Sequence, residues 1–437
     1  MARLCMWTSI SNKIPPKGCW IPCPGIVVAS ILTRIAATLF LVILALLPCE
    51  GQDWLDQLQT APALKSPNGS IRSDVTVYVD AEGYYIDQRP PGLLYPNESF
   101  FNPRTTFFVD TELGKHFYSL LQARVDRGFD PGERNVPEAR LDEYLLRWTP
   151  CDSDVVNLQF GKFATAVGNW VVRHDSWDNP LITPPLPYAN ITTISDGEAP
   201  ASPAEFLGRR NLAVPKDEWA PVIWGPAYAT GGEVFGSILD FDYSAEIKNT
   251  SVSSHPDEWG LSSSMWNYPT FDGRLGFRPS PAWKHGVSFS IGPYLYAEAQ
   301  PSLPPGKSLS DYNQINLGYD ISYAWHRWQL WGEVFLTRFQ VPNVGDADLL
   351  TYYLEAKYQI SANFYAAARW NQQIFGSVAN GGNGRQTWGD DMIQVDLALG
   401  YRFTRHLQAK VQYSFNHRDA SLQQGAQLVA GQITLKF

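Results

Sequence analysis

The chain ends with the stretch Gly431-Gln-Ile-Thr-Leu-Lys-Phe437, in which apolar and polar side chains alternate strictly. Every second residue from Ile433 onward is apolar, and the residues between them are polar. Because successive side chains of a β-strand point to opposite faces, this stretch predicts a strand with one apolar and one hydrated face. The strand ends on the aromatic residue Phe437.

The same alternation returns at similar length through the second half of the chain, for example in residues 314–325, 392–403 and 408–416. Strands of roughly ten residues exceed the usual 5–6 and match the 9–11 needed to cross a bilayer at a tilt. Tight turns such as His326-Arg327 alternate with longer connections, for example Phe339–Asp348, which is typical of transmembrane barrels.

The predicted strands number sixteen, within a range of 14 to 18, and the predicted fold class is all-β, a closed antiparallel transmembrane β-barrel. Their ranges are 75–85, 105–110, 117–126, 139–148, 155–163, 222–228, 233–248, 271–278, 286–298, 314–325, 328–338, 350–359, 363–372, 392–403, 408–416 and 428–437. The alternative is a soluble sandwich that buries the apolar faces. Aromatic residues at the strand ends and mixed charge on the polar faces favour the membrane barrel with a wide, hydrated lumen.

The first 51 residues have the anatomy of a secretory signal peptide. Basic residues such as Arg34 precede the uncharged apolar run 35–47, and Gly51 follows as a small residue near a cleavage site. A retained membrane helix over 25–47 is the alternative, at a cost of about 2.5–3.5 kcal/mol for Arg34 in its middle. We expect a leader (1–51), an N-terminal periplasmic segment (52–73) and a barrel (74–437).

Composition excludes several classes of function. The chain has 34 Lys and Arg against 43 Asp and Glu, a net charge of −9, which is the wrong sign for a nucleic-acid partner. Four of the five cysteines lie in the leader and leave Cys151 alone, so no internal disulfide and no cysteine metal site is expected after cleavage. We expect no catalytic residues, no metal site and no cofactor.

Two resemblances to known families follow from these residues. The final strand with its terminal Phe437 resembles the closing strand of bacterial outer-membrane barrels, where this aromatic residue is the signal read by the insertion machinery. The stretch Leu158-Gln-Phe-Gly-Lys-Phe163 followed by Val167-Gly168 resembles the phosphate-selective-type porins. The resemblance implies a Gram-negative outer-membrane protein with lipid as its surroundings and small hydrophilic solutes as cargo, and a homotrimer is the assembly it implies by analogy. The loop lacks the closely spaced basic residues of phosphate-binding members, so no phosphate ligands are assigned.

The segment 165–220 is the main candidate for function, because such a long stretch without periodicity is uncommon unless it has a role. In porins a long loop folds into the lumen and narrows it; the alternative is a solvated outer loop. The candidates for the pore constriction are its charged residues Arg173, His174, Asp175, Asp178, Arg209 and Arg210. The candidates that line the lumen are charged residues on the polar strand faces: Asp320, Glu355, Lys357, Asp396, Arg402, Lys410 and Lys436.

The sequence therefore predicts a passive channel for small hydrophilic solutes or ions, with cation preference from its acidic balance. Two alternatives stay open. One is an outer-membrane lipase-type enzyme using His174 and Ser176, which are two residues apart as in that family. The other is a structural barrel with a plugged lumen.

Overall fold

The computed structural model describes residues 64–87, 99–127, 137–212, 218–419 and 425–437. The predicted leader and residues 52–63 lie outside these ranges. Within them, helices are short, and none is both long and apolar enough to cross a membrane.

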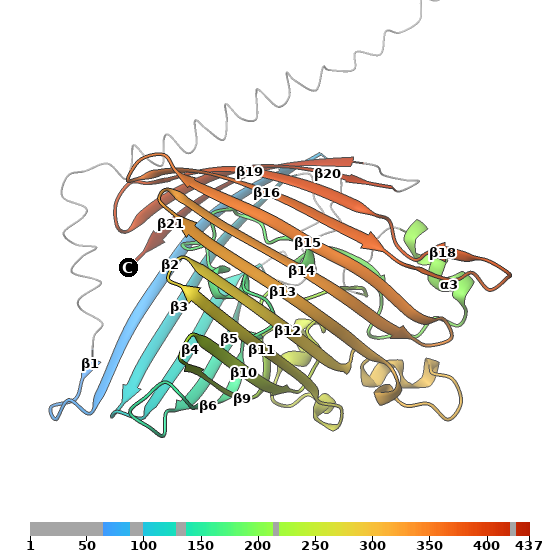
Figure 1. The fold of residues 1–437 in the computed structure, drawn as a ribbon, viewed down its shortest axis with the longest axis horizontal. Coiled ribbons are helices and arrows are strands. Elements are labelled where there is room, and N and C mark those ends of the chain that lie inside the picture. Colours follow the sequence, from blue (N-terminus) through green and yellow to red (C-terminus); the bar gives the residue numbers. More distant parts are fainter. Residues whose placement is uncertain (1–63, 88–98, 128–136, 213–217, 420–424) are drawn as a thin grey trace, which may run out of the picture. The chain divides into compact units, whose positions relative to one another are not determined.

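Sixteen strands form a closed antiparallel barrel, as predicted (Figure 1). They are β2 (Ile71–Ile86), β3 (Ser99–Leu113), β4 (Phe117–Asp126), β5 (Glu138–Trp148), β6 (Asn157–Phe163), β9 (Ala229–Ile238), β10 (Phe241–Lys248), β11 (Thr270–Ser280), β12 (Trp283–Pro293), β13 (Asn313–Trp325), β14 (Trp328–Val341), β15 (Gly345–Gln359), β16 (Phe364–Phe375), β19 (Met392–Arg402), β20 (Leu407–Arg418) and β21 (Gly425–Lys436). Each pairs with the next along the chain, and β1 (Leu64–Lys65) extends the sheet beside the start of β2.

The barrel closes where the last strand meets the first. Strand β21 pairs with β2 from Tyr78 opposite Lys436 to Ile86 opposite Leu428. Beyond β21, the backbone N–H of Val77 donates to the carbonyl oxygen of Phe437 at 2.6 Å, and the N–H of Phe437 donates back at 3.0 Å. The terminal residue is therefore part of the closing seam.

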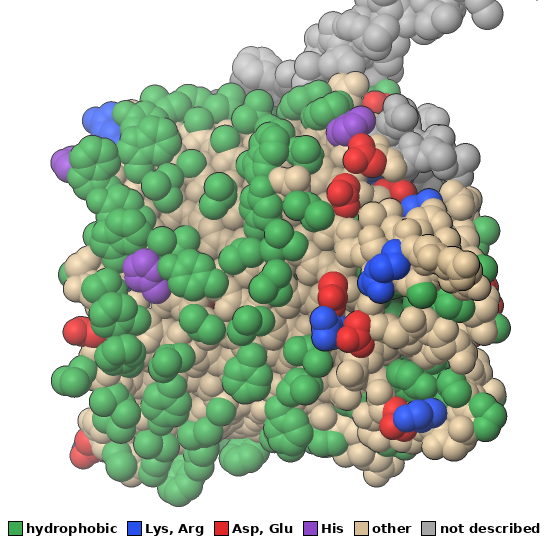
Figure 2. Space-filling model, turned by 45° about the vertical axis from the view of Figure 1, so that its right-hand side comes forward, with side chains coloured by type: hydrophobic (Ala, Val, Ile, Leu, Met, Phe, Trp, Pro, Cys, Tyr) green, Lys and Arg blue, Asp and Glu red, His purple; other side chains and the backbone are tan. Residues whose placement is uncertain are grey.

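The outer face of the barrel is apolar and exposed. Leu317 and Leu336, on neighbouring strands, are 50% and 55% exposed, whereas the alternate residue Asn316 is 1% exposed. Figure 2 shows hydrophobic side chains over the strand surface, with acidic and basic side chains gathered mainly toward the right-hand end. A large exposed apolar surface of this kind is what a lipid-facing barrel requires.

Aromatic residues gather at the end of the barrel where the short turns lie. Trp283 lies 4.2 Å from Tyr323 between ring centroids, and Trp328 lies 4.7 Å from Tyr358. All four residues stand within a few positions of a short turn. Aromatic rings in this position match the girdle that membrane barrels place at the headgroup level.

Three predictions about individual strands were wrong. Two of them leave the number of strands at sixteen, because one predicted strand is absent and another is two strands. Residues 222–228 are not a strand: they are buried, and the N–H of Ile223 donates to the carbonyl of Pro187 within the same segment. The range predicted as one strand, 233–248, is two, because the chain turns at Leu239 with φ of 56°. An apolar run packed on all sides gives the same short sequence pattern as a strand.

The third error concerns Phe339–Asp348, which was predicted as a long loop. Strands β14 and β15 continue to Val341 and from Gly345, where Arg338 pairs with Asp348 across the hairpin at 2.6 Å. Charged and turn-forming residues ended the predicted strands too early, because the pattern is reversed there: Arg338 and Asp348 are exposed on the outer face, whereas Phe339 and Ala347 are buried on the inner face.

Candidate functional site

A long segment, residues 164–228, leaves the barrel wall after β6, and its residues 164–194 and 219–228 lie inside the barrel (green in Figure 1). We call it the inserted segment. Its described parts hold η1 (Val171–Arg173), η2 (Leu186–Tyr188), β7 (Ile191–Ile194), α3 (Pro203–Gly208), η3 (Arg209–Asn211) and β8 (Ala220–Pro221). Gly168 begins the inward turn with φ of 82°, and a Cβ there would collide with the Tyr188 hydroxyl.

Glu333 on β14 holds the beginning of the inserted segment. Its carboxylate accepts from the backbone N–H of Asn169 at 2.6 Å and of Trp170 at 2.5 Å, and the Tyr188 hydroxyl donates to its other oxygen. Burial raises the pKa of Tyr188 well above its ordinary value, and the charge of Glu333 raises it further. Tyr188 therefore stays protonated and serves as a donor.

Lys410 on β20 holds the middle of the inserted segment. Its ammonium group donates to the backbone carbonyls of Ser176 at 2.6 Å, Asn179 at 3.0 Å and Leu181 at 3.3 Å. It is 1% exposed. A lysine whose three donors are all used in this way fixes backbone position and adds little charge to open water.

A buried ion-pair network joins the segment to β15, β16 and β19. Arg173 in the segment pairs with Glu355 at 2.6 Å, and its guanidinium lies 4.3 Å from the Trp331 ring centroid. Arg369 pairs with the same Glu355 at 3.4 Å and with Asp396 at 2.9 Å. Burial lowers the pKa of Arg173, but the hydrogen bond to Glu355 and the charges of Glu355, Tyr353 and Glu333 together outweigh it and raise that pKa above its ordinary value.

Three cavities lie between the inserted segment and the barrel wall. The first is bordered by β3 to β6 and β9 to β11, the second mainly by β2 to β4, and the third by β2 to β4 and β19 to β21. The widest, of about 1020 Å³, borders the short turns near Gly114 and Asp154. The next is about 80 Å³ and shares His174 and Asp175 with the first. The third is about 160 Å³ and shares Trp170 with the second. Because neighbouring cavities share lining residues, they lie end to end, and we call the series the passage.

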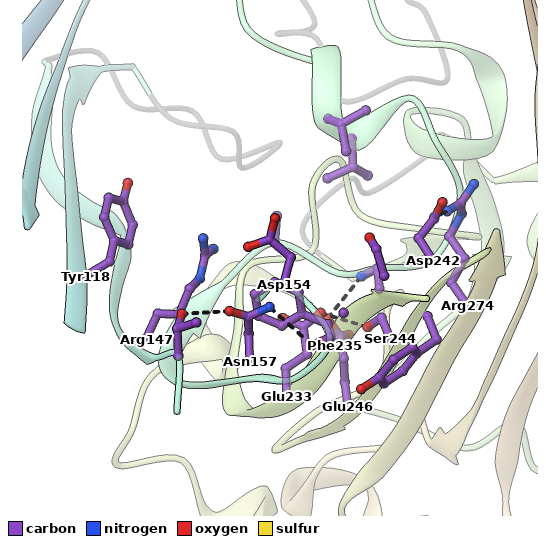
Figure 3. Close-up of a pocket in the computed structure, with 18 of the residues that line it drawn as sticks. Tyr118, Arg147, Asp154, Asn157, Glu233, Phe235, Asp242, Ser244, Glu246 and Arg274 are labelled. Atoms are coloured by element: carbon purple, nitrogen blue, oxygen red, sulfur yellow. Dashed lines mark hydrogen bonds and ion pairs between the residues drawn. The ribbon is translucent and has the colours of Figure 1, made fainter. Parts of the chain in front are cut away.

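The wide cavity is acidic (Figure 3). Seven acidic side chains line it against three lysines and arginines, so the acidic excess is four. The acidic residues are Glu112, Glu143, Asp154, Asp175, Glu233, Asp242 and Glu246, and the basic residues are Lys115, Arg147 and Arg274. Arg274 pairs with Asp242 at 2.9 Å, the arrangement drawn at the right of Figure 3.

The wall of the narrow cavity carries paired charges from neighbouring strands. Arg104 pairs with Asp80 at 3.0 Å and with Glu82 at 2.7 Å. Arg124 pairs with Asp142 at 2.9 Å. Trp170 and Ile182 of the inserted segment face this wall across the cavity. The same side also carries the polar residues His174 and Asp175. A constriction with charged groups on its wall selects solutes by charge as well as by size.

The six residues predicted to form the pore constriction lie in different surroundings. His174 and Asp175 line the passage, Arg173 points into the ion-pair network, and Asp178 is exposed. Arg209 and Arg210 lie beyond β7, and Arg210 donates to the carbonyl of Thr387 at 3.1 Å in β18 (Arg385–Thr387), far along the chain in the loop after β16.

The predicted lumen-lining residues all belong to inward strand faces but differ in their surroundings. Asp320, Glu355, Asp396 and Lys410 are at most 2% exposed and hold other protein groups. Arg402 and Lys436 both lie beside the Trp177 ring, at 4.7 and 5.6 Å from its centroid. Lys357 lies 4.6 Å from the Tyr365 ring centroid.

The lipase-type arrangement is not formed. His174 uses both ring nitrogens in hydrogen bonds, to the Val171 carbonyl at 2.5 Å and to the Tyr228 hydroxyl at 2.6 Å. Ser176 is buried inside the barrel, with its carbonyl bound by Lys410.

Sequence reasoning missed the charged wall of β2 to β5. The signal was present, since Asp80 and Glu82 are two residues apart, and the same spacing recurs for Arg124 with Asp126 and Arg140 with Asp142. The spacing of two puts such residues on one strand face. Their register across neighbouring strands, which brings Asp80 opposite Arg104, is what the sequence could not give.

No family model and no curated protein matches this sequence. Solved structures are similar in fold. The anion-selective porin from Comamonas acidovorans aligns over 84% of this chain and 100% of its own, with a TM-score of 0.53 and 10% identity. OmpF of Salmonella typhi, solved with daunomycin, covers 86% and 100% with a TM-score of 0.52 and 12% identity. The outer-membrane channel DcaP of Acinetobacter baumannii covers 86% and 99% with a TM-score of 0.51 and 10% identity. At these identities the similarity is one of fold, and the chain has a porin-like fold.

Proposed function

We propose that this protein is an outer-membrane diffusion channel through which small hydrophilic solutes or ions cross along the passage. The observation that supports this most directly is the series of cavities with charged linings inside a barrel whose outer surface is apolar. A barrel of this kind presents hydrocarbon-compatible side chains to lipid and polar ones to solutes. The porin-like neighbours support the same assignment.

The expected selectivity is for cations. The acidic excess of the wide cavity raises the local concentration of cations at one entrance of the passage. Phosphate is not the solute we propose, because Arg104 and Arg124, which border the narrow cavity, are each paired with carboxylates.

The test is the conductance of the purified protein in a planar bilayer. We expect stepwise currents in KCl and a reversal potential of cation-selective sign in a salt gradient. Absence of conductance would support a plugged structural barrel, and clear anion selectivity would contradict the role given to the acidic cavity.

A matched pair of variants tests whether the solute passes through the narrow cavity. Thr106 on β3 is buried and lines the narrow cavity, whereas its neighbour Thr105 belongs to the opposite, outward face of the same strand. Thr106→Trp should lower the conductance strongly by filling a cavity of about 80 Å³. Thr105→Trp adds the same ring on the lipid side and should leave the conductance near that of the unmodified protein.

A further inference from the structure

The third cavity of the passage has features that transport of simple ions does not require. Its volume is about 160 Å³, close to the roughly 150 Å³ of an engineered protein cavity that binds benzene. It lies between the inserted segment and the wall formed by β2 to β4 and β19 to β21, on the side of the narrow cavity away from the short turns. It therefore has room for one body the size of a six-membered ring.

Three buried polar atoms on residues that line this cavity have no hydrogen-bond partner among the described residues. They are Asn102 Oδ1, Asn190 Oδ1 and Trp170 Nε1, on side chains that are 8%, 5% and 3% exposed. An unpaired buried polar atom is costly, by about 1–3 kcal/mol, so a ligand that pairs with it gains that energy.

The chemistry of these atoms is defined by their neighbours. The amide nitrogen of Asn102 donates to Glu82 at 3.4 Å, and that of Asn190 donates to Gln373 at 3.0 Å, which leaves each carbonyl oxygen as an acceptor. The indole nitrogen of Trp170 is a donor only. The cavity thus offers two acceptors and one donor to a bound molecule.

The charges that line the cavity balance. Glu82 and Asp126 stand against Arg104 and Arg124. A molecule with a single charge would meet as much repulsion as attraction, whereas one that carries both signs can place each beside its opposite. The balanced wall therefore favours a zwitterion over a simple cation or anion.

The remaining lining is largely apolar. Tyr84 and Ile86 on β2, Leu428 on β21, and Ile182 and Leu186 on the inserted segment form this part. Tyr84, Ile86 and Leu428 also pack into one buried cluster with Ile182 against them. A polyol would leave this apolar surface unused, whereas a hydrocarbon or aromatic side chain would cover it.

We propose that this cavity binds a free amino acid with an aromatic or branched apolar side chain, as a site within the passage. The ammonium group would donate to the unpaired carbonyl oxygen of Asn102 or of Asn190, the carboxylate would accept from Trp170, and the side chain would lie on the apolar wall. The proposal rests on the channel function, since the cavity is reached through the barrel.

Binding is measured by isothermal titration of the full, detergent-solubilised protein with L-phenylalanine. The comparison ligands are 3-phenylpropionate, which lacks the ammonium group, and 2-phenylethylamine, which lacks the carboxylate. We expect L-phenylalanine to bind at least about tenfold more tightly than either, because each analogue loses one charged hydrogen-bonding group. Equal binding of an analogue, or no binding of L-phenylalanine, overturns the proposal.

Trp170→Phe keeps the aromatic ring and removes the donor. We expect it to weaken L-phenylalanine binding about fivefold, the loss of one hydrogen bond. The control is Trp266→Phe, in an exposed loop whose indole donates to Leu261, which should bind as the unmodified protein does. Unchanged affinity of Trp170→Phe, in protein with the heat-modifiable gel mobility of a folded barrel, overturns the assignment.

The same preparation separates the two proposals. KCl conductance without L-phenylalanine binding overturns the amino-acid site and leaves the channel intact. Binding without conductance supports the site and overturns the channel function.

Discussion

Arg369 on β16 and Asp396 on β19 form an ion pair of 2.9 Å that is completely buried inside the barrel. The same guanidinium donates to the carbonyl oxygens of Thr183 at 2.9 Å and Pro184 at 3.1 Å in the inserted segment. A pair between wall strands thus also fixes the position of a segment far away in the sequence. Such anchors fix the distance between the inserted segment and the wall on the far side of the narrow cavity. The width of the passage therefore depends on them.

Arg369→Met should destabilise the protein strongly. Removing one partner leaves the buried carboxylates of Asp396 and Glu355 without this cation, a loss of about 3–5 kcal/mol. Arg338→Met is the control, because its pairs with Asp346 and Asp348 are exposed and are worth about 0–1 kcal/mol. Urea unfolding of the barrel in lipid vesicles measures both, and equal effects would contradict the role given to burial.

Lys410→Met should release the middle of the inserted segment. Three backbone carbonyls lose their donor, and we expect a higher, fluctuating single-channel conductance with a loss of about 1–3 kcal/mol in stability. Lys307→Met, in an exposed loop where it pairs with Asp311, controls for the loss of a positive charge. A steady conductance equal to that of the unmodified protein would show that Lys410 does not set the position of the segment.

Neutralising two acids at the wide cavity should reduce cation preference. Glu112→Gln with Asp154→Asn lowers the acidic excess of the lining from four to two, and both residues are exposed, so the fold should tolerate the change. The reversal potential in a salt gradient should move toward zero. Asp257→Asn, an exposed acid in the loop between β10 and β11, is the control and should leave the reversal potential unchanged. A shift of equal size in both proteins would argue against selection at the cavity.

The closing role of Phe437 and its proposed role as insertion signal can be separated. Deleting Phe437 removes two backbone hydrogen bonds to Val77, about 2 kcal/mol together, whereas Phe437→Ala keeps them and removes the ring. If the ring is the signal, both variants should yield less folded barrel in the outer membrane, measured by heat-modifiable gel mobility, and Phe437→Tyr should assemble normally. Normal assembly of Phe437→Ala would contradict the role of the ring as an insertion signal. The role of Phe437 would then be limited to its backbone hydrogen bonds at the closing seam.

Leu317→Arg places a charge on the outer face of the barrel near the middle of β13. We expect a loss of about 2–4 kcal/mol in lipid vesicles, as for basic residues at the bilayer midplane of barrels. Leu261→Arg, in an exposed loop, should change stability by no more than about 0.5 kcal/mol. Similar stabilities of the two variants would mean that Leu317 does not face lipid.

The regular strands were predictable because the sequence of each one alternates between apolar and polar residues. In residues 392–403 and 408–416 the alternation continues for the full length of a strand, and the structure places β19 and β20 there. The pattern failed where the surroundings differ from those of a membrane strand. The run 222–228 is buried on all sides. At the ends of β14 and β15 the charged side chains of Arg338 and Asp348 are exposed, whereas Phe339 and Ala347 are buried inside, which reverses the membrane pattern.

The sequence alone determined the class of fold, because lipid outside and polar groups inside impose a period of two on every membrane strand. It determined neither the charged wall nor the anchors of the inserted segment. Arg104 meets Asp80, and Lys410 meets the carbonyls of residues 176–181, through strand register and the path of the segment inside the barrel. The pairing of Arg104 with Asp80 depends on the register of the neighbouring strands β2 and β3. Lys410 and residues 176–181 are far apart in the chain and meet only because the segment lies inside the closed barrel.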